Sequence, residues 1–131
     1  NVNAMARIGY LYLRRGRWRD RQIIPASFVD MARKVPEAVG GLPVVRKDSY
    51  FNASDHYGLL WWNNADGTMA KVPRDAYFSW GLYDSLIVVM PSLDIVAARA
   101  GKSLNKARNS DYKAIEPFIE PIVLSLREKK Q

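Results

Sequence analysis

Cysteine is absent from this 131-residue sequence, and histidine occurs only once, at His56. Without Cys the chain forms neither disulfide bonds nor thiolate metal sites. One His and carboxylates dispersed along the sequence do not make a recognisable metal site either. We therefore expect no metal and no other cofactor.

Long apolar runs, internal repeats and low-complexity blocks are also missing. No stretch approaches the roughly 18–20 apolar residues of a membrane-spanning helix, so we expect no membrane span. Neither a glycine-rich phosphate loop nor a signal-peptide pattern is present. Because the first residue is Asn1 rather than Met, we expect that the sequence does not begin where translation began and that a leader could have been lost, which leaves the compartment open.

Apolar and basic residues are both abundant. The hydrophobic fraction of 48% is enough to build a core, which argues against disorder. The formal net charge is +7, and its densest cluster places Arg14, Arg15, Arg17, Arg19 and Arg21 around Trp18. Two interpretations stay open for this turn. It is either a phosphate-gripping surface with a stacking aromatic or a solvated helix end whose cations complement the helix dipole.

Hydrophobic periodicity predicts helices at both ends of the chain and strands between them. The expected elements are helices at 3–15 and 25–35, a long loop at 36–56, strands at 57–62 and 68–72, a hairpin of strands at 86–90 and 95–100, and a helix at 111–127. Pro117 and Pro121 fall within the last helix, where we expect a break or kink. This order is typical of an α+β fold, an antiparallel sheet covered by helices on one face.

Three stretches resemble the last third of the class C β-lactamase, esterase and penicillin-binding-protein family. They are Met5–Leu13 with Gly16-Arg17-Trp18 and Arg21–Pro25, then Tyr57–Trp62, and then Asp75–Gly81 continuing through Val88–Val96. The stretches occur in the family's order and span nearly the whole chain. The resemblance implies that residues 1–131 are a single segment, the C-terminal portion of a β-lactamase/transpeptidase-like fold whose upstream part is absent.

The family's chemistry, as the resemblance implies it, needs three elements. A Ser in S-x-x-K attacks a carbonyl with help from its Lys, a Tyr element relays the proton, and a K-T-G or H-x-G strand lines the pocket. The first two elements lie upstream of the region that this chain resembles, so we expect no catalytic residue here. The substrate of the full enzyme would be a small ester, amide or peptide. The resemblance also favours a periplasmic or secreted location.

The third element falls at Ser79-Trp80-Gly81, which with Tyr83 makes the expected substrate-binding set. Ser79 stands where the family has Lys, His or another residue, so it offers a hydrogen bond but not the cation of the Lys variant. This departure favours an esterase, amidase or peptidase over a true β-lactamase. We expect the Trp80 side chain to face away from the pocket and Gly81 to allow close approach of substrate or backbone. Ordinary strand residues remain the alternative interpretation.

Several other residues invite a chemical interpretation that the family order does not support. Trp61, Trp62 and Tyr83 suit either the pocket wall or the core behind it. Ser103–Lys106 and Ser110–Lys113 spell S-x-x-K, and Tyr50–Asn52 spells Y-x-N, but both serines follow the third element. We therefore do not expect Ser103 or Ser110 to be a nucleophile. His56 is expected to be a loop histidine near a strand start, not a partner of Ser79 or Ser85 in a triad.

Two functional hypotheses follow. In the first, the chain is a fragment of a serine hydrolase that supplies the sheet and one active-site wall, with possible self-association of the fragment and no nucleic acid partner. In the second, it is a binding module whose Arg14–Arg21 turn binds nucleic acid or an acidic partner. Steep weakening of binding by salt would distinguish the second from the first.

Overall fold

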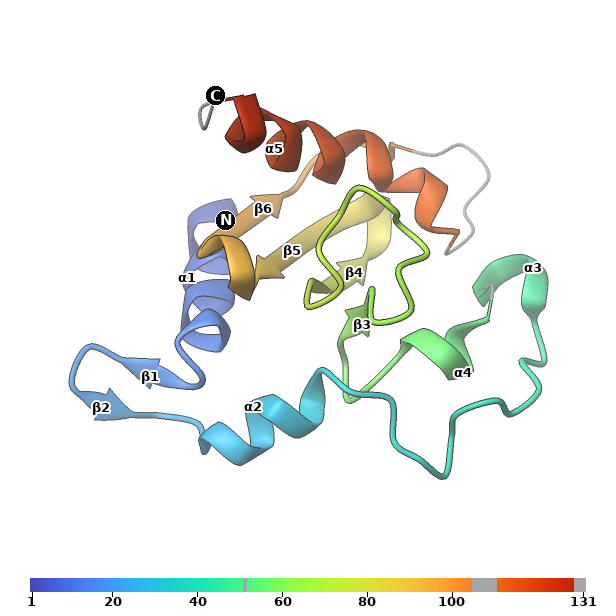
Figure 1. The fold of residues 1–131 in the computed structure, drawn as a ribbon, viewed down its shortest axis with the longest axis horizontal. Helices are drawn as coiled ribbons and strands as arrows, with labels where there is room; N and C mark the ends of the chain where they lie inside the picture. Colours follow the sequence, from blue (N-terminus) through green and yellow to red (C-terminus); the bar gives the residue numbers. More distant parts are fainter. Residues whose placement is uncertain (51, 105–110, 129–131) are drawn as a thin grey trace.

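A four-stranded antiparallel sheet lies at the centre of the computed structural model, which describes residues 1–50, 52–104 and 111–128 (Figure 1). Its strands, in spatial order, are β3 (Trp62–Asn63), β4 (Tyr77–Gly81), β5 (Ser85–Met90) and β6 (Ile95–Arg99). The β5–β6 hairpin has the predicted position, with Met90 opposite Ile95. The predicted α+β class is confirmed.

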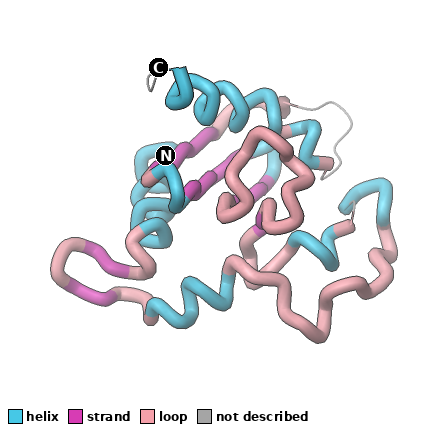
Figure 2. Tube along the Cα trace, in the orientation of Figure 1, coloured by secondary structure: helices cyan, strands magenta, loops and turns pink. Residues whose placement is uncertain are grey.

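Helices and turns surround this sheet (Figure 2). They are α1 (Val2–Leu13), α2 (Ala26–Ala32), α3 (Lys47–Tyr50), α4 (Ala53–His56) and α5 (Glu116–Glu128), with 3-10 turns η1 (Leu82–Asp84), η2 (Pro91–Leu93) and η3 (Tyr112–Ala114). A small ribbon joins β1 (Arg17–Trp18) to β2 (Arg21–Gln22). Within the described ranges, none of the helices combines the length and apolarity that crossing a membrane requires.

Helices cover both faces of the sheet, which corrects the expectation of a single covered face. Leu86, Val88 and Met90 of β5 join the core cluster that includes Ile119 and Val123 of α5. Ile87 and Val89 point the other way, into a cluster that α1 covers. The sequence of β5, Ser-Leu-Ile-Val-Val-Met, is an almost continuous apolar run, which is typical of a strand buried on both faces.

The aromatic run at 57–62 is not a strand, contrary to the prediction. Only Trp62 belongs to β3, and Tyr57 forms an isolated bridge with that same residue. The chain turns sharply between them, with Leu60 in the left-handed region at φ 68° and largely exposed. Aromatic and apolar composition favoured a strand here, but the tight turn brings the two ends of the run together.

The weak strand predicted at 68–72 is also wrong. This segment wraps around the buried side chain of Asn64, whose Nδ2 donates to the carbonyls of Met69, Val72 and Pro73 at 3.0–3.3 Å. The Asn64 Oδ1 accepts from the Met69 N–H at 2.9 Å. Because a side chain satisfies these backbone groups, the segment has no need of a strand partner, and β3 pairs with β4 instead.

Prolines do not break α5. The helix runs without interruption from Glu116 to Glu128 through both Pro117 and Pro121. Pro117 lies in the first turn, where its missing N–H would have no intrahelical partner. The long loop predicted at 36–56 contains the short helices α3 and α4.

Gly58 allows the chain to pass directly beneath the end of α2. A Cβ added at Gly58 would lie 2.4 Å from the Ala32 carbonyl oxygen and 2.5 Å from that of Lys34.

Because both obstacles are backbone atoms, we expect Gly58→Ala to lower the free energy of unfolding by about 2–3 kcal/mol. Urea denaturation measures this change. Gly40→Ala is the matched control, since an added Cβ there meets no atom closer than 3.9 Å; equal stability of the two variants would contradict the prediction.

Candidate functional site

One edge of β4 is only partly paired. β3 covers Tyr77 and Phe78, and beyond them no described strand pairs with this edge. The Ala76 carbonyl accepts from the Asn64 N–H on the β3 side. Backbone groups alternate in direction along a strand, so the N–H and C=O of Trp80 face the same edge. This open edge can hydrogen-bond an extended ligand as an added strand would.

The three residues of the expected substrate-binding strand divide between two faces. Ser79 and Gly81 lie on the same face as Tyr77, towards α1, whereas Trp80 lies on the face of Phe78, towards α5. The Trp80 ring packs against Trp62 at a centroid distance of 6.0 Å. A ligand at the open edge of β4 could therefore contact Trp80 only through its backbone. On the α1 side of the strand it could contact the Ser79 side chain and the space left by Gly81.

Gly81 is not required by the fold that surrounds it. Its backbone is extended, with φ −123°, which any residue adopts. A Cβ added there would meet only the Ser85 carbonyl oxygen, at 4.0 Å. Gly81 therefore leaves open space at the end of the strand.

The turn that follows β4 is strained. Tyr83 and Asp84 are adjacent non-glycine residues in the left-handed region, with φ of 58° and 53°. The Arg99 Nη1 donates to both of their carbonyls, at 3.0 and 2.7 Å, and so holds the turn from β6. Such conformations cost about 1–3 kcal/mol each and gather at functional sites. The Tyr83 side chain in this turn is exposed.

Asp84 anchors this turn from within. Its buried carboxylate accepts from the Trp80 Nε1 at 2.9 Å and from the Ser103 hydroxyl and Leu104 N–H at 2.6 Å each. Asp is well suited to a left-handed position such as this one. Through its contact with Asp84 the Ser103 hydroxyl helps to hold the turn. Ser110 lies outside the described residues.

Of the aromatic wall candidates, only Tyr83 is exposed. Trp61 is buried against Tyr12 and Tyr77, with centroid distances of 4.5 and 5.2 Å. Trp62 is buried on the opposite side, where it contacts Trp80 and Tyr112. Both tryptophans therefore belong to the core, and Tyr83 remains the candidate for a pocket wall.

His56 is the last residue of α4 and is fully buried, which corrects its expected place in a loop. Its ring packs on Tyr112 at 4.9 Å, and its Nε2 lies 3.5 Å from the Asp66 Oδ2. Partial burial raises the pKa of Asp66, but hydrogen bonds from Thr68 and the charge of His56 outweigh it and leave that pKa lowered. These contacts favour a structural role for His56.

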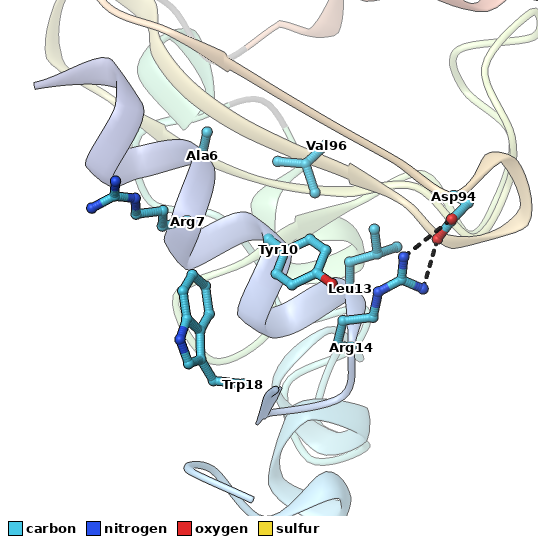
Figure 3. A pocket seen from close by; sticks show the side chains of 8 residues that line it. All are labelled: Ala6, Arg7, Tyr10, Leu13, Arg14, Trp18, Asp94 and Val96. Atoms are coloured by element: carbon cyan, nitrogen blue, oxygen red, sulfur yellow. Dashed lines mark hydrogen bonds and ion pairs between the residues drawn. The ribbon is translucent and has the colours of Figure 1, made fainter. Parts of the chain in front are cut away.

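The arginine turn lies at a hollow of about 360 Å³ between α1 and β6 (Figure 3). There Arg14 reaches Asp94 with both terminal nitrogens, at 2.9 and 3.1 Å, and Trp18 packs edge-on against Tyr10. Arg15 pairs with Asp30. Arg14 and Arg15 are thus neutralised by aspartates, and the Trp18 ring already packs against Tyr10. The arginine turn is therefore less suited to bind phosphates than its sequence suggested.

Comparisons with known proteins place the fold. No protein-family model and no curated protein matches the sequence. One solved structure that matches is named "Putative 6-aminohexanoate-dimer hydrolase from Bacillus anthracis", at 19% identity and a TM-score of 0.64. The match covers 97% of this chain and 29% of that chain, so this chain spans less than a third of the hydrolase's length. The chain thus shares its α+β fold with part of that hydrolase.

Proposed function

We propose that this chain is the C-terminal part of a serine hydrolase that cleaves an ester or amide through a serine acyl-enzyme. The chain supplies the sheet and one wall of the active site, and the nucleophilic Ser and its Lys belong to sequence that precedes it. The observation that carries the proposal is the open edge of β4, which ends at a glycine that the surrounding fold does not require.

Each residue of the wall has a distinct role in this proposal. The Trp80 N–H and C=O, at the open edge, bind the backbone or amide of an extended substrate. The half-buried Ser79 hydroxyl donates a hydrogen bond to a substrate carbonyl or carboxylate. Gly81 leaves room for close approach, and the exposed Tyr83 side chain closes one side.

Three further observations support the proposal: the first is consistent with a larger enzyme, and the other two concern the class of its substrate. Val45, Leu60 and Leu82 project into solvent, exposed by 99%, 77% and 83%, and such apolar side chains suit burial under additional chain or self-association of this segment. The absence of Lys at position 79 favours ester, amide or peptide hydrolysis over β-lactam hydrolysis. The similar solved structure is named for a 6-aminohexanoate dimer, which favours an amide.

The 131-residue chain alone is expected to show no hydrolysis of p-nitrophenyl acetate or nitrocefin above the buffer rate, because the proposal places its nucleophile elsewhere. Product release is followed by absorbance, and labelling by a fluorophosphonate is followed by intact-protein mass. The Ser103→Ala variant serves as a control. Stoichiometric labelling that disappears in this variant would show that Ser103 is a nucleophile and that the proposal is wrong.

A further inference from the structure

The end of β4 that the proposed function uses has a neighbouring strand on one side only. Trp80 pairs with Leu86 of β5, and on the other side no described strand extends past Phe78. A strand end with one neighbour opens more easily than a strand paired on both edges, because fewer backbone hydrogen bonds hold it. A further contact is therefore needed to fix the direction of the Trp80 N–H and C=O at the open edge.

The Trp80 side chain makes such a contact on the α5 face of the sheet. Its ring packs against Trp62, and its Nε1–H donates to the Asp84 Oδ1 at 2.9 Å. Asp84 is buried and lies four residues further along the chain, at the end of the turn after β4. Hydrogen bonds to a carboxylate are stronger than those between neutral groups. The indole therefore ties the open end of β4 to a buried anionic anchor.

This anchor is itself held from outside β4. The Asp84 Oδ2 accepts from the Ser103 hydroxyl and the Leu104 N–H, in the segment after β6, and Arg99 of β6 donates to the Asp84 carbonyl. Three donors thus converge on the two carboxylate oxygens. An asparagine side chain has one acceptor oxygen and could not serve all three. The arrangement therefore uses the charge of Asp84 as well as its shape.

We propose that Asp84 is a positioning residue for substrate binding. It acts through the Trp80 indole and holds the Trp80 backbone groups in the direction that an extended ester or amide substrate requires. Asp84 touches no substrate in this arrangement, because its carboxylate is buried and receives hydrogen bonds from the protein. The inference rests on the proposed function and adds to it a residue that acts from behind the active-site wall.

Asp84→Asn in the 131-residue chain tests the link between Asp84 and the indole. Asn has nearly the size of Asp and tolerates the left-handed backbone, so the turn should keep its shape. Its single oxygen best serves the Leu104 N–H, whose direction is fixed, and its amide then faces the Trp80 Nε1–H, donor against donor. In nuclear magnetic resonance spectra we expect the Trp80 indole resonance to change position and its proton to exchange faster with solvent. Trp80→Phe identifies that resonance.

Kinetics of the full-length enzyme test the positioning role with two esters. N-acetylglycine p-nitrophenyl ester has an amide that can pair with the Trp80 backbone, whereas p-nitrophenyl acetate has none. Asp84→Asn should raise KM for the first ester about threefold to tenfold and leave KM for the second unchanged. We expect little change in kcat, because the contact is present in the ground state and the transition state alike. A purely structural role would affect both esters equally.

Further variants separate the possible outcomes. Trp80→Phe keeps a ring against Trp62 and should raise KM for the first ester to a similar degree, and the double variant should raise it no further. Asp94→Asn makes the same change at another left-handed position, on the surface, and should leave KM unchanged. A wild-type enzyme that hydrolyses neither ester would overturn the proposed function together with this inference. An active wild-type enzyme in which Asp84→Asn or Trp80→Phe affects both esters equally or neither, or in which the two changes are additive, would overturn the positioning role alone.

Discussion

Replacing Gly81 by valine is expected to leave the 131-residue chain folded while reducing kcat/KM of the complete enzyme by about a hundredfold or more. The chain itself has open space at this position and an extended backbone that valine adopts readily. The proposed substrate is what needs the space. Steady-state kinetics with the full-length protein, together with urea denaturation of the short chain, measures the two effects separately.

Ser79→Ala provides the comparison for Gly81→Val. It removes one neutral hydrogen bond from the same face of β4, worth about 0.5–1.5 kcal/mol, so kcat/KM should fall by about twofold to twelvefold. A Gly81→Val enzyme that folds and keeps wild-type turnover would show that residues 79–81 are scaffold. In that case the proposed function would lose the observation on which it chiefly rests.

Asp84→Ala is expected to lower the free energy of unfolding by about 2–4 kcal/mol. The substitution removes a buried carboxylate and leaves the Trp80 Nε1–H, the Ser103 hydroxyl and the Leu104 N–H without their acceptor. The turn after β4 would also lose the anchor that holds it in a strained conformation. Urea denaturation followed by tryptophan fluorescence measures the loss.

Asp94→Ala is a close control for this change. Asp94 also has a left-handed backbone, with φ 54°, so the conformational penalty of alanine is common to both positions. Its carboxylate pairs with Arg14 at the exposed surface, where ion pairs contribute little. We expect a loss of stability much smaller than that of Asp84→Ala. Similar losses for the two variants would mean that the buried hydrogen bonds of Asp84 stabilise the fold far less than their geometry suggests.

Local sequence patterns correctly predicted two kinds of element: a helix with one apolar face and a strand made of a continuous apolar run. Periodicity placed α1, and the apolar run of β5 with the turn at Pro91–Asp94 placed the hairpin with β6. The continuous apolar run of β5 also indicates burial on both faces of the strand. On the sequence alone, this run was used only to predict a strand. The strand β4 has no strong periodicity, since it ends in Ser-Trp-Gly, and only the family resemblance located it.

The geometry of the candidate site depends on contacts between residues far apart in the sequence. Local sequence patterns do not predict such contacts. Arg99 holds the turn at Tyr83, and Ser103 binds Asp84, across separations of 16 and 19 residues. Trp61 and Trp62 are adjacent and aromatic, yet their side chains lie in different core clusters. The sequence predicts the set Ser79, Trp80, Gly81 and Tyr83. Only the structure of the sheet shows that Trp80 presents a backbone group, Gly81 open space and Tyr83 an exposed ring.

The hydrogen bonds of Asn64 also bear on the order in which the chain folds. All four join residues five to nine positions apart, so the loop from Asn64 to Pro73 closes with little loss of chain entropy. The β4–β5–β6 meander is likewise sequential, whereas the packing of α1 on β6 joins segments more than 80 residues apart. Local closure is fast and distant pairing is slow. The loop and the meander are therefore the natural early structures, and docking of the N-terminal helix is the late step that completes the core.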